Sequence, residues 1–389
     1  MSRLWSRRGL LQGAAAGLVL PRLALAGTSD RRFLFVFCEG GWDVTRCFAP
    51  LFDTQVAMEE SAVTGTLGDL SFVDHEARPA VRSFFESYGD RTCILNGIEV
   101  RSITHERCRR IVMTGGSATD VDDWPVQLAA ESDALLPHVV VSGPSFSNRY
   151  TSSVVRLGET GQIQGLLDGS ALSESDLALT VPSLAVEALE DAALAAALDR
   201  QAGRFVDAYR SADAQLELAI ARADELALAP EGELLTTAQR AQSALTLFEQ
   251  GLSRCAIVQN RGLFDRGWDD HSEIERQSDH FSVLFESLDA ILAELEDRGL
   301  AESTTVVVFS EMGRAPSINA TGGKDHWTYT SAMLVGSGVA GGQVLGGFDE
   351  NLIGTPYEGT SLTAAHFGAT VLALGGLAGE VPPIEAALS

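Results

Sequence analysis

Short apolar runs alternate with amphipathic segments along most of this chain, and this alternation constrains its fold more than any other sequence feature. The runs occupy residues 32–38, 92–96, 138–142, 304–310 and 332–336. A continuous apolar run of this length is typical of a strand that is buried on both faces of a parallel sheet. We therefore expect a central sheet built from these segments.

The segments between the runs have the periodicity of helices. The clearest is residues 281–295, where apolar residues recur at intervals of three and four and Gly299 follows as an end signal. Alternating strands and helices predict an α/β fold, with a mostly parallel central sheet flanked by helices.

Residues 172–256 differ from the rest of the chain. They are rich in Ala, Leu, Glu, Asp and Arg, contain no strand-like run, and are broken mainly at Pro-Glu-Gly, residues 230–232. We expect two or three long helices that form an all-α insertion or cap. A helical repeat protein is the alternative, although the segment has no fixed period.

The composition excludes several classes of protein. Of the 389 residues, 45% are hydrophobic, which supports a large core and excludes disordered and collagen-like chains. The chain has 53 acidic residues against 28 Lys and Arg, and its formal net charge is −25. Nucleic acids and anionic membranes require a cationic surface, so we expect neither as a partner.

The first 26 residues have the features of an export signal. Arg7 and Arg8 precede an apolar run at residues 10–20, and small residues follow at 24–26. The paired arginines predict a twin-arginine signal peptide, recognised by the twin-arginine translocon, and a mature domain over residues 27–389. An uncleaved anchor is the alternative, but a membrane span needs about 20 apolar residues. We expect a periplasmic or secreted protein with no stable membrane span after cleavage.

Polar residues follow the predicted strands at the edge where ligands bind in open α/β sheets. Asp43 comes after two glycines that follow the first run, although an aspartate in a loop can also be a helix cap or a turn former. Asp269 and His271 are two residues apart, so in an extended segment they point the same way and can share one metal ion. The alternative is a polar turn with an exposed histidine.

A second set of polar residues follows the run at residues 304–310. Asp325 and His326 come after two glycines and are candidate metal ligands, while Arg314 and Lys324 are candidate donors to an anionic substrate group. Glu311 lies directly after the run. A simple salt bridge between Glu311 and Arg314 is the alternative for these two residues.

A hydroxyl group precedes a predicted helix at residues 105–114. Thr104 would lie at the positive end of the helix dipole, where a nucleophile or a phosphate ligand is well placed. An ordinary helix N-cap is the alternative.

Taken in order, these motifs resemble those of a known family. They are the twin-arginine leader, EGGWD at 39–43, THER at 104–107, WDDH at 268–271, SEMGR at 310–314, KDHW at 324–327 and GSGVAGGQVLG at 336–346. The sequence resembles the domain of unknown function 1501 family of exported bacterial proteins, which is similar to the alkaline phosphatase and sulfatase superfamily. The resemblance implies an alkaline phosphatase-like α/β fold and a divalent metal, with zinc, calcium or manganese expected.

The resemblance also implies roles for individual residues. It assigns one metal site to Asp43, Asp269, His271 and His326. Glu311 falls where the superfamily has the first residue of an Asp-His pair for a second metal, but Met312 replaces the histidine. Thr104 is the best match to the nucleophile.

Two functions follow from this resemblance as expectations. The first is an exported metal-dependent hydrolase that acts on phosphate or sulfate esters, with a small anionic ester or an envelope glycan as substrate. The second is a non-catalytic periplasmic or cell-envelope binding protein that retains the fold.

Overall fold

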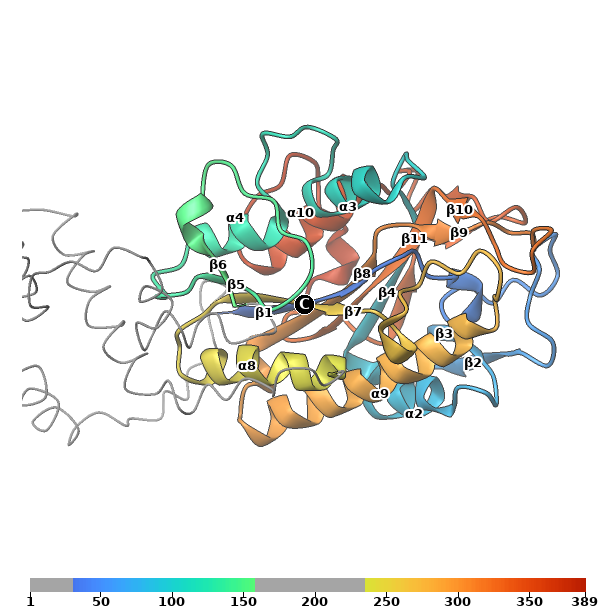
Figure 1. The fold of residues 1–389 in the computed structure, drawn as a ribbon, viewed down its shortest axis with the longest axis horizontal. Coiled ribbons are helices and arrows are strands. Elements are labelled where there is room, and N and C mark those ends of the chain that lie inside the picture. Colours follow the sequence, from blue (N-terminus) through green and yellow to red (C-terminus); the bar gives the residue numbers. More distant parts are fainter. Residues whose placement is uncertain (1–30, 158–234) are drawn as a thin grey trace, which may run out of the picture.

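A large mixed sheet forms the centre of the protein (Figure 1). The computed structural model describes residues 31–157 and 235–389. Within them the sheet has eight strands in the order β12-β4-β11-β8-β1-β7-β5-β6. Their bounds are β1 Arg32–Cys38, β4 Thr92–Glu99, β5 His138–Val140, β6 Val154–Arg156, β7 Cys255–Asn260, β8 Thr304–Ser310, β11 Tyr329–Gly336 and β12 Gln343–Leu345.

Most neighbouring strands of this sheet are parallel. β1 pairs in parallel with both β7 and β8, whereas β11 runs antiparallel between β4 and β8. The five apolar runs are all strands, so the predicted mostly parallel sheet is confirmed. The expectation that residues 172–256 contain no strand is wrong at its end, because β7 begins at Cys255. The greater part of the predicted helical cap lies outside the described residues.

Helices cover both faces of the sheet (Figure 1). On one face lie α3 (His105–Thr114), α4 (Trp124–Ala130) and α10 (Ala364–Leu374). On the other lie α2 (Pro79–Tyr88), α8 (Thr237–Glu249) and α9 (Arg276–Asp297). The predicted helices at 105–114 and 281–295 are thereby confirmed. No helix among the described residues is both long and apolar enough to cross a membrane.

The alternation of side chains along β1 explains its continuous apolar run. Phe33 and Phe35 belong to the core cluster that includes Phe367 of α10, whereas Leu34 belongs to the cluster that includes Phe281 of α9. Because successive side chains of a strand point to opposite faces, a strand covered on both sides must be apolar at every position.

Shorter strand pairs surround the sheet. They are β2 (Val63–Leu67) with β3 (Leu70–Asp74), β9 (Gly313–Arg314) with β10 (His326–Trp327), and β13 (Gly347–Phe348) with β14 (Gly354–Thr355). The β9–β10 pair places His326 opposite Arg314. It therefore brings the loop after β8 and a motif further along the chain to the same edge of the sheet.

Candidate metal centre

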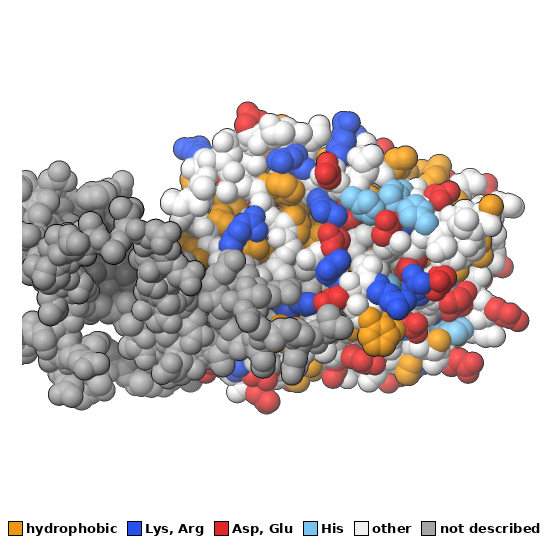
Figure 2. All heavy atoms as spheres, viewed as in Figure 1, with side chains coloured by type: hydrophobic (Ala, Val, Ile, Leu, Met, Phe, Trp, Pro, Cys, Tyr) orange, Lys and Arg blue, Asp and Glu red, His pale blue; other side chains and the backbone are white. Residues whose placement is uncertain are grey.

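Three histidines surround the carboxylate of Asp269 near the carboxyl ends of β1 and β8. His271 Nε2 lies 3.1 Å and His326 Nε2 3.0 Å from Asp269 Oδ1, while His105 Nε2 lies 3.3 Å from Oδ2. A group of histidine side chains is visible at the surface in Figure 2. His105 begins α3, Asp269 and His271 precede α9, and His326 lies in β10. The fold therefore brings together side chains from three distant segments.

Hydrogen bonds fix the orientation of two of these imidazoles. His326 Nδ1 donates to the carbonyl oxygen of Ile103 at 2.6 Å, and His105 Nδ1 is 2.9 Å from Glu311 Oε1. A carbonyl can only accept, so the Nδ1 atom of His326 carries a proton and its Nε2 presents a lone pair in the neutral ring. Metal-bound histidines are oriented in this way, with the second ring nitrogen donating to a carbonyl or a carboxylate.

His271 completes a compact triangle of donor atoms. Its Nε2 lies 3.0 Å from His326 Nε2, and both face Asp269 Oδ1. Its Nδ1 lies 3.4 Å from Asp325 Oδ1. Ligands about 2.1 Å from a tetrahedral or octahedral ion are about 3.0–3.4 Å apart, so the triangle fits one divalent ion. The ligand atoms of His105, Asp269 and His326 also lie within 4.8 Å of one another, which makes His105 a further donor.

The surroundings of Asp269 keep its carboxylate charged. Burial alone would raise the pKa of Asp269, but hydrogen bonds from His105, His326 and Arg314 hold it far below its usual range. Hydrogen bonds to Asp269 and Glu311 raise the pKa of His105 to about 9. In the absence of a metal, a proton on His105 therefore supplies positive charge beside the Asp269 carboxylate.

Arg314 is a buried residue that donates hydrogen bonds to Asp269 and to the backbone around it. Its side chain is fully buried, and Nη2 donates to Asp269 Oδ1 at 2.7 Å. It also donates to the backbone carbonyls of Gly41, Trp268 and Lys324 at 2.8, 3.0 and 3.1 Å. Arg314 therefore joins three loops and does not reach solvent. The sequence assigned Arg314 to an anionic substrate group, but its burial leaves it no contact with a substrate.

Lys324 and Asp43 form a separate buried pair. Lys324 Nζ lies 2.8 Å from Asp43 Oδ2 and 3.0 Å from Thr45 Oγ1. Asp43 Oδ1 also caps the short 3₁₀ helix Val44–Arg46 by accepting from Thr45 N. Burial opposes the charge of Asp43, but Lys324 outweighs it and lowers the pKa of Asp43. The structure therefore gives Asp43 the cap role, not a place in the triangle, and gives Lys324 an internal partner.

A family model described as "Protein of unknown function (DUF1501)" matches residues 30–380. The chain belongs to the DUF1501 family. No curated protein matches its sequence significantly.

The DUF1501 chain is also similar to solved structures, at low identity. Lipoteichoic acid synthase LtaP from Listeria monocytogenes aligns with a TM-score of 0.42 and 8% identity, covering 92% of this chain and 74% of that one. The sulfatase PsFucS1 from Pseudoalteromonas sp. gives 0.42 and 10%, covering 90% and 69%. A protein in the alkaline phosphatase superfamily from Vibrio parahaemolyticus gives 0.39 and 8%, covering 90% and 68%.

Glu311 contacts the backbone and His105 in this DUF1501 protein, and not Arg314, the salt-bridge partner that the sequence suggests. It is fully buried, and it accepts hydrogen bonds from Gly40 N at 2.9 Å and from His105 Nδ1. Its salt bridge with Arg314, the alternative from the sequence, does not form, because Arg314 pairs with Asp269. Glu311 thus orients His105.

The two remaining predicted residues lie at the rim of the site. Asp325 is exposed and contacts His271 and Asn319. Thr104 is exposed at the N-cap position of α3, and its side chain makes no capping hydrogen bond there. It directly precedes His105.

Glycines of the family motifs allow loops to approach the site closely. A Cβ atom on Gly40, whose φ is +123°, would lie 2.5 Å from the backbone nitrogen of Asp269. A Cβ atom on Gly323 would lie 2.1 Å from the carbonyl carbon of His271. Only glycine fits at these two positions, so the glycines hold Asp269 and His271 in place.

Sequence reasoning on the DUF1501 chain missed His105 as a candidate ligand. In the THER motif the hydroxyl of Thr104 suggests a nucleophile, although the next residue is a histidine at the start of the same helix. A histidine at a helix start that follows a buried strand was the available signal.

Proposed function

We propose that this protein is an exported metal-dependent hydrolase of phosphate or sulfate esters. The observation that supports this most is the convergence of His105, His271 and His326 on Asp269, with each Nδ1 atom beside an oxygen acceptor. Imidazole-rich sites favour zinc over calcium, which prefers oxygen ligands. When bound, such an ion polarises an ester oxygen and lowers the pKa of a coordinated hydroxyl group.

The residues of the chain have distinct tasks in this proposal. Asp269, His271 and His326 hold the ion, and Glu311 orients His105 through its Nδ1 atom. The exposed hydroxyl of Thr104 is the proposed nucleophile, because it directly precedes His105 at the surface of the site. Arg314 positions Asp269 and does not contact the substrate.

An assay of the exported protein tests the proposal. Purified protein should contain about one divalent ion per chain and hydrolyse p-nitrophenyl phosphate or p-nitrophenyl sulfate. A chelator should abolish turnover, and added zinc or manganese should restore it. The variant Thr104→Ala should keep its metal but lose turnover. If fully metal-loaded protein hydrolyses neither ester, the proposal of a hydrolase is contradicted.

One set of contacts favours the second candidate, a periplasmic or cell-envelope binding protein. The two cations expected to bind an anionic substrate, Arg314 and Lys324, are buried and paired inside the protein. A metal-loaded chain that binds an anionic ester or glycan without cleaving it would establish this candidate.

A further inference from the structure

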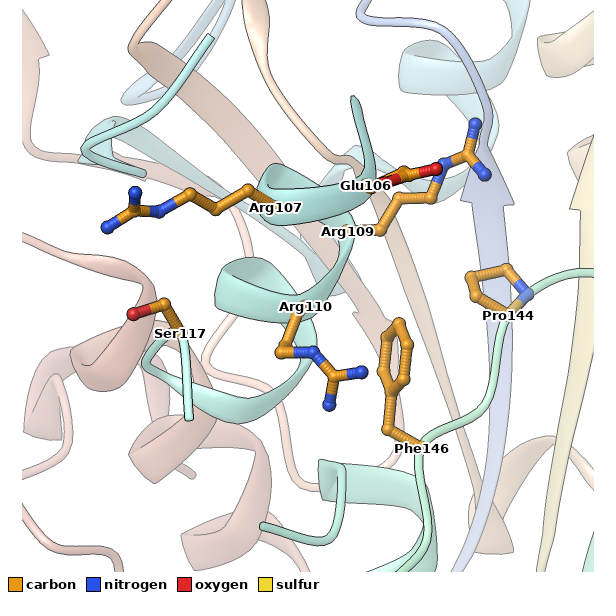
Figure 3. A pocket seen from close by; sticks show the side chains of 7 residues that line it. All are labelled: Glu106, Arg107, Arg109, Arg110, Ser117, Pro144 and Phe146. Atoms are coloured by element: carbon orange, nitrogen blue, oxygen red, sulfur yellow. The ribbon is translucent and has the colours of Figure 1, made fainter. Parts of the chain in front are cut away.

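A hollow of about 660 Å³ lies along α3 (Figure 3), and its lining includes Glu106, the residue after His105. Its volume lies within the range of small-molecule binding sites. We call it the α3 pocket, and the residues of interest in its lining are Glu106, Arg107, Arg109, Arg110, Ser117 and Phe146.

The α3 pocket concentrates positive charge in a chain whose net charge is −25. Three arginines line it against a single acid, Glu106. Arg109 pairs with Glu39 at 2.9 Å. Among residues 31–157 and 235–389, no carboxylate pairs with the guanidinium group of Arg107 or Arg110. Two of the cations are therefore available to a ligand.

One of these cations is held in a defined position. The guanidinium carbon of Arg110 lies 4.3 Å from the centroid of the Phe146 ring, and Figure 3 shows the two side chains facing each other. Stacking on an aromatic ring restricts the guanidinium group without using its hydrogen-bond donors. Arginine donors bind sulfate and phosphate groups in a bidentate manner.

The α3 pocket is connected to the metal centre through one helix. Arg109 lies four residues after His105, about 6 Å further along the helix axis. Its Nε atom is 3.9 Å from Glu311 Oε1, the same oxygen that accepts from His105 Nδ1. A single ligand that extends along α3 from His105 can therefore contact both places.

We propose that the α3 pocket binds a second anionic group, a sulfate or a phosphate, on the same substrate molecule whose ester lies at Asp269. This inference rests on the proposed function and specifies its substrate class. The substrate is then a compound with at least two anionic ester groups, and a simple monoester occupies only the Asp269 end of the site. Arg110, held against Phe146, binds the group that is not cleaved, and Arg107 adds positive charge to the lining of the same hollow.

Binding measurements on chelator-treated protein test the α3 pocket without requiring turnover. The ligands are a trisulfated disaccharide, a sugar bisphosphate and an unsulfated disaccharide, each titrated by calorimetry at fixed salt. The pocket variant is Arg107→Ala/Arg110→Ala. Its control is Arg82→Ala/Arg91→Ala, which removes the same charge at and next to α2, on the opposite face of the sheet.

We expect the pocket variant to bind the trisulfated disaccharide or the sugar bisphosphate at least about tenfold more weakly than wild type, because one charge-assisted contact and one nearby positive charge are lost. The control should bind as wild type does. The anion that loses more affinity identifies the source of the group. Three results would overturn the inference. They are equal losses of affinity in the pocket and control variants, unchanged affinity in the pocket variant, and wild-type protein that binds a glutamate-rich peptide more tightly than either anionic sugar.

The proposed function can fail independently of this inference. If pocket-dependent binding is found but metal-loaded protein cleaves no ester, the hydrolase is wrong and the α3 pocket stands. If simple esters are cleaved but anion binding does not depend on Arg107 and Arg110, only the inference on the pocket is wrong.

Discussion

The Nε2 atoms of His271 and His326 lie 3.0 Å apart, although 55 residues separate the two histidines in the sequence. Both atoms face Asp269 Oδ1, and both rings have their Nδ1 atom beside an oxygen acceptor. If each ring carries its proton on Nδ1, the two Nε2 lone pairs repel each other at this distance. A cation placed between the rings and the carboxylate removes the repulsion, which makes this contact the strongest local argument for a metal.

Removing either ring should therefore empty the centre. We expect His271→Ala and His326→Ala each to lower the metal content of folded protein at least about tenfold, because each removes a ligand. Elemental analysis after gel filtration measures this. His138→Ala is the matched control, since His138 is buried in β5 and should leave the metal content unchanged. Equal metal content in all variants would exclude this centre.

The loop that supports His271 should be equally sensitive. Gly323→Ala places a methyl group 2.1 Å from the carbonyl carbon of His271, so the backbone must move. We expect the variant to fold with lower metal content and with about 1–3 kcal/mol less stability. Gly116→Ala is the control, because no atom lies within 4 Å of its added Cβ. Unchanged metal content in Gly323→Ala would show that the close approach has no role in the centre.

Much of the fold was predictable because a sheet buried on both faces leaves a strong signal. The runs at 32–38 and 304–310 match β1 and β8 to the residue. β7 does not stand out as an apolar run, because it ends in Gln259 and Asn260. Asn260 donates to Thr237 Oγ1 and accepts from Trp268 Nε1, so its polar side chain serves the loops at the sheet edge.

The sequence predicts the site only where the spacing of two residues decides that their side chains point the same way. The two-residue spacing of Asp269 and His271 is a local property, and the structure brings them to His326. The partner of Asp43 is not local, because Lys324 lies 281 residues away and only the fold brings the two together. Burial then decides their role, since a buried carboxylate needs a paired cation.

A variant of Arg314 tests whether this residue positions Asp269, as its burial indicates, or contacts a substrate. Arg314→Met leaves Asp269 and several backbone carbonyls without their donor, so we expect a loss of about 3–5 kcal/mol in unfolding free energy. Metal content should fall as well, because Asp269 loses its orientation. Arg82→Met removes a half-exposed partner of Asp74 and should cost about 1 kcal/mol or less. Lost stability with full metal content would mean that Arg314 does not position Asp269.

The predicted export signal, residues 1–26, lies outside the described residues, and its test is a change of sequence. Replacing Arg7 and Arg8 together by Lys should retain folded protein in the cytoplasm, since the paired arginines are read by the translocon. Cell fractionation with an antibody measures the distribution. Normal export of the double variant would contradict the twin-arginine assignment.

His138 should make the stability of the protein depend on pH. The side chain is fully buried in β5, and burial lowers the pKa of His138 to about 3. The unfolded chain takes up a proton near pH 6.5 and the folded chain does not, so stability is complete above pH 6.5 and falls as the pH drops toward 3. Between pH 7 and pH 5 this residue should account for about 2 kcal/mol of lost unfolding free energy. In His138→Leu that loss should shrink by the same amount, whatever the variant does to stability at pH 7. Urea unfolding of both proteins at the two pH values measures the difference, and an identical pH dependence would show that His138 is not held neutral in the folded state.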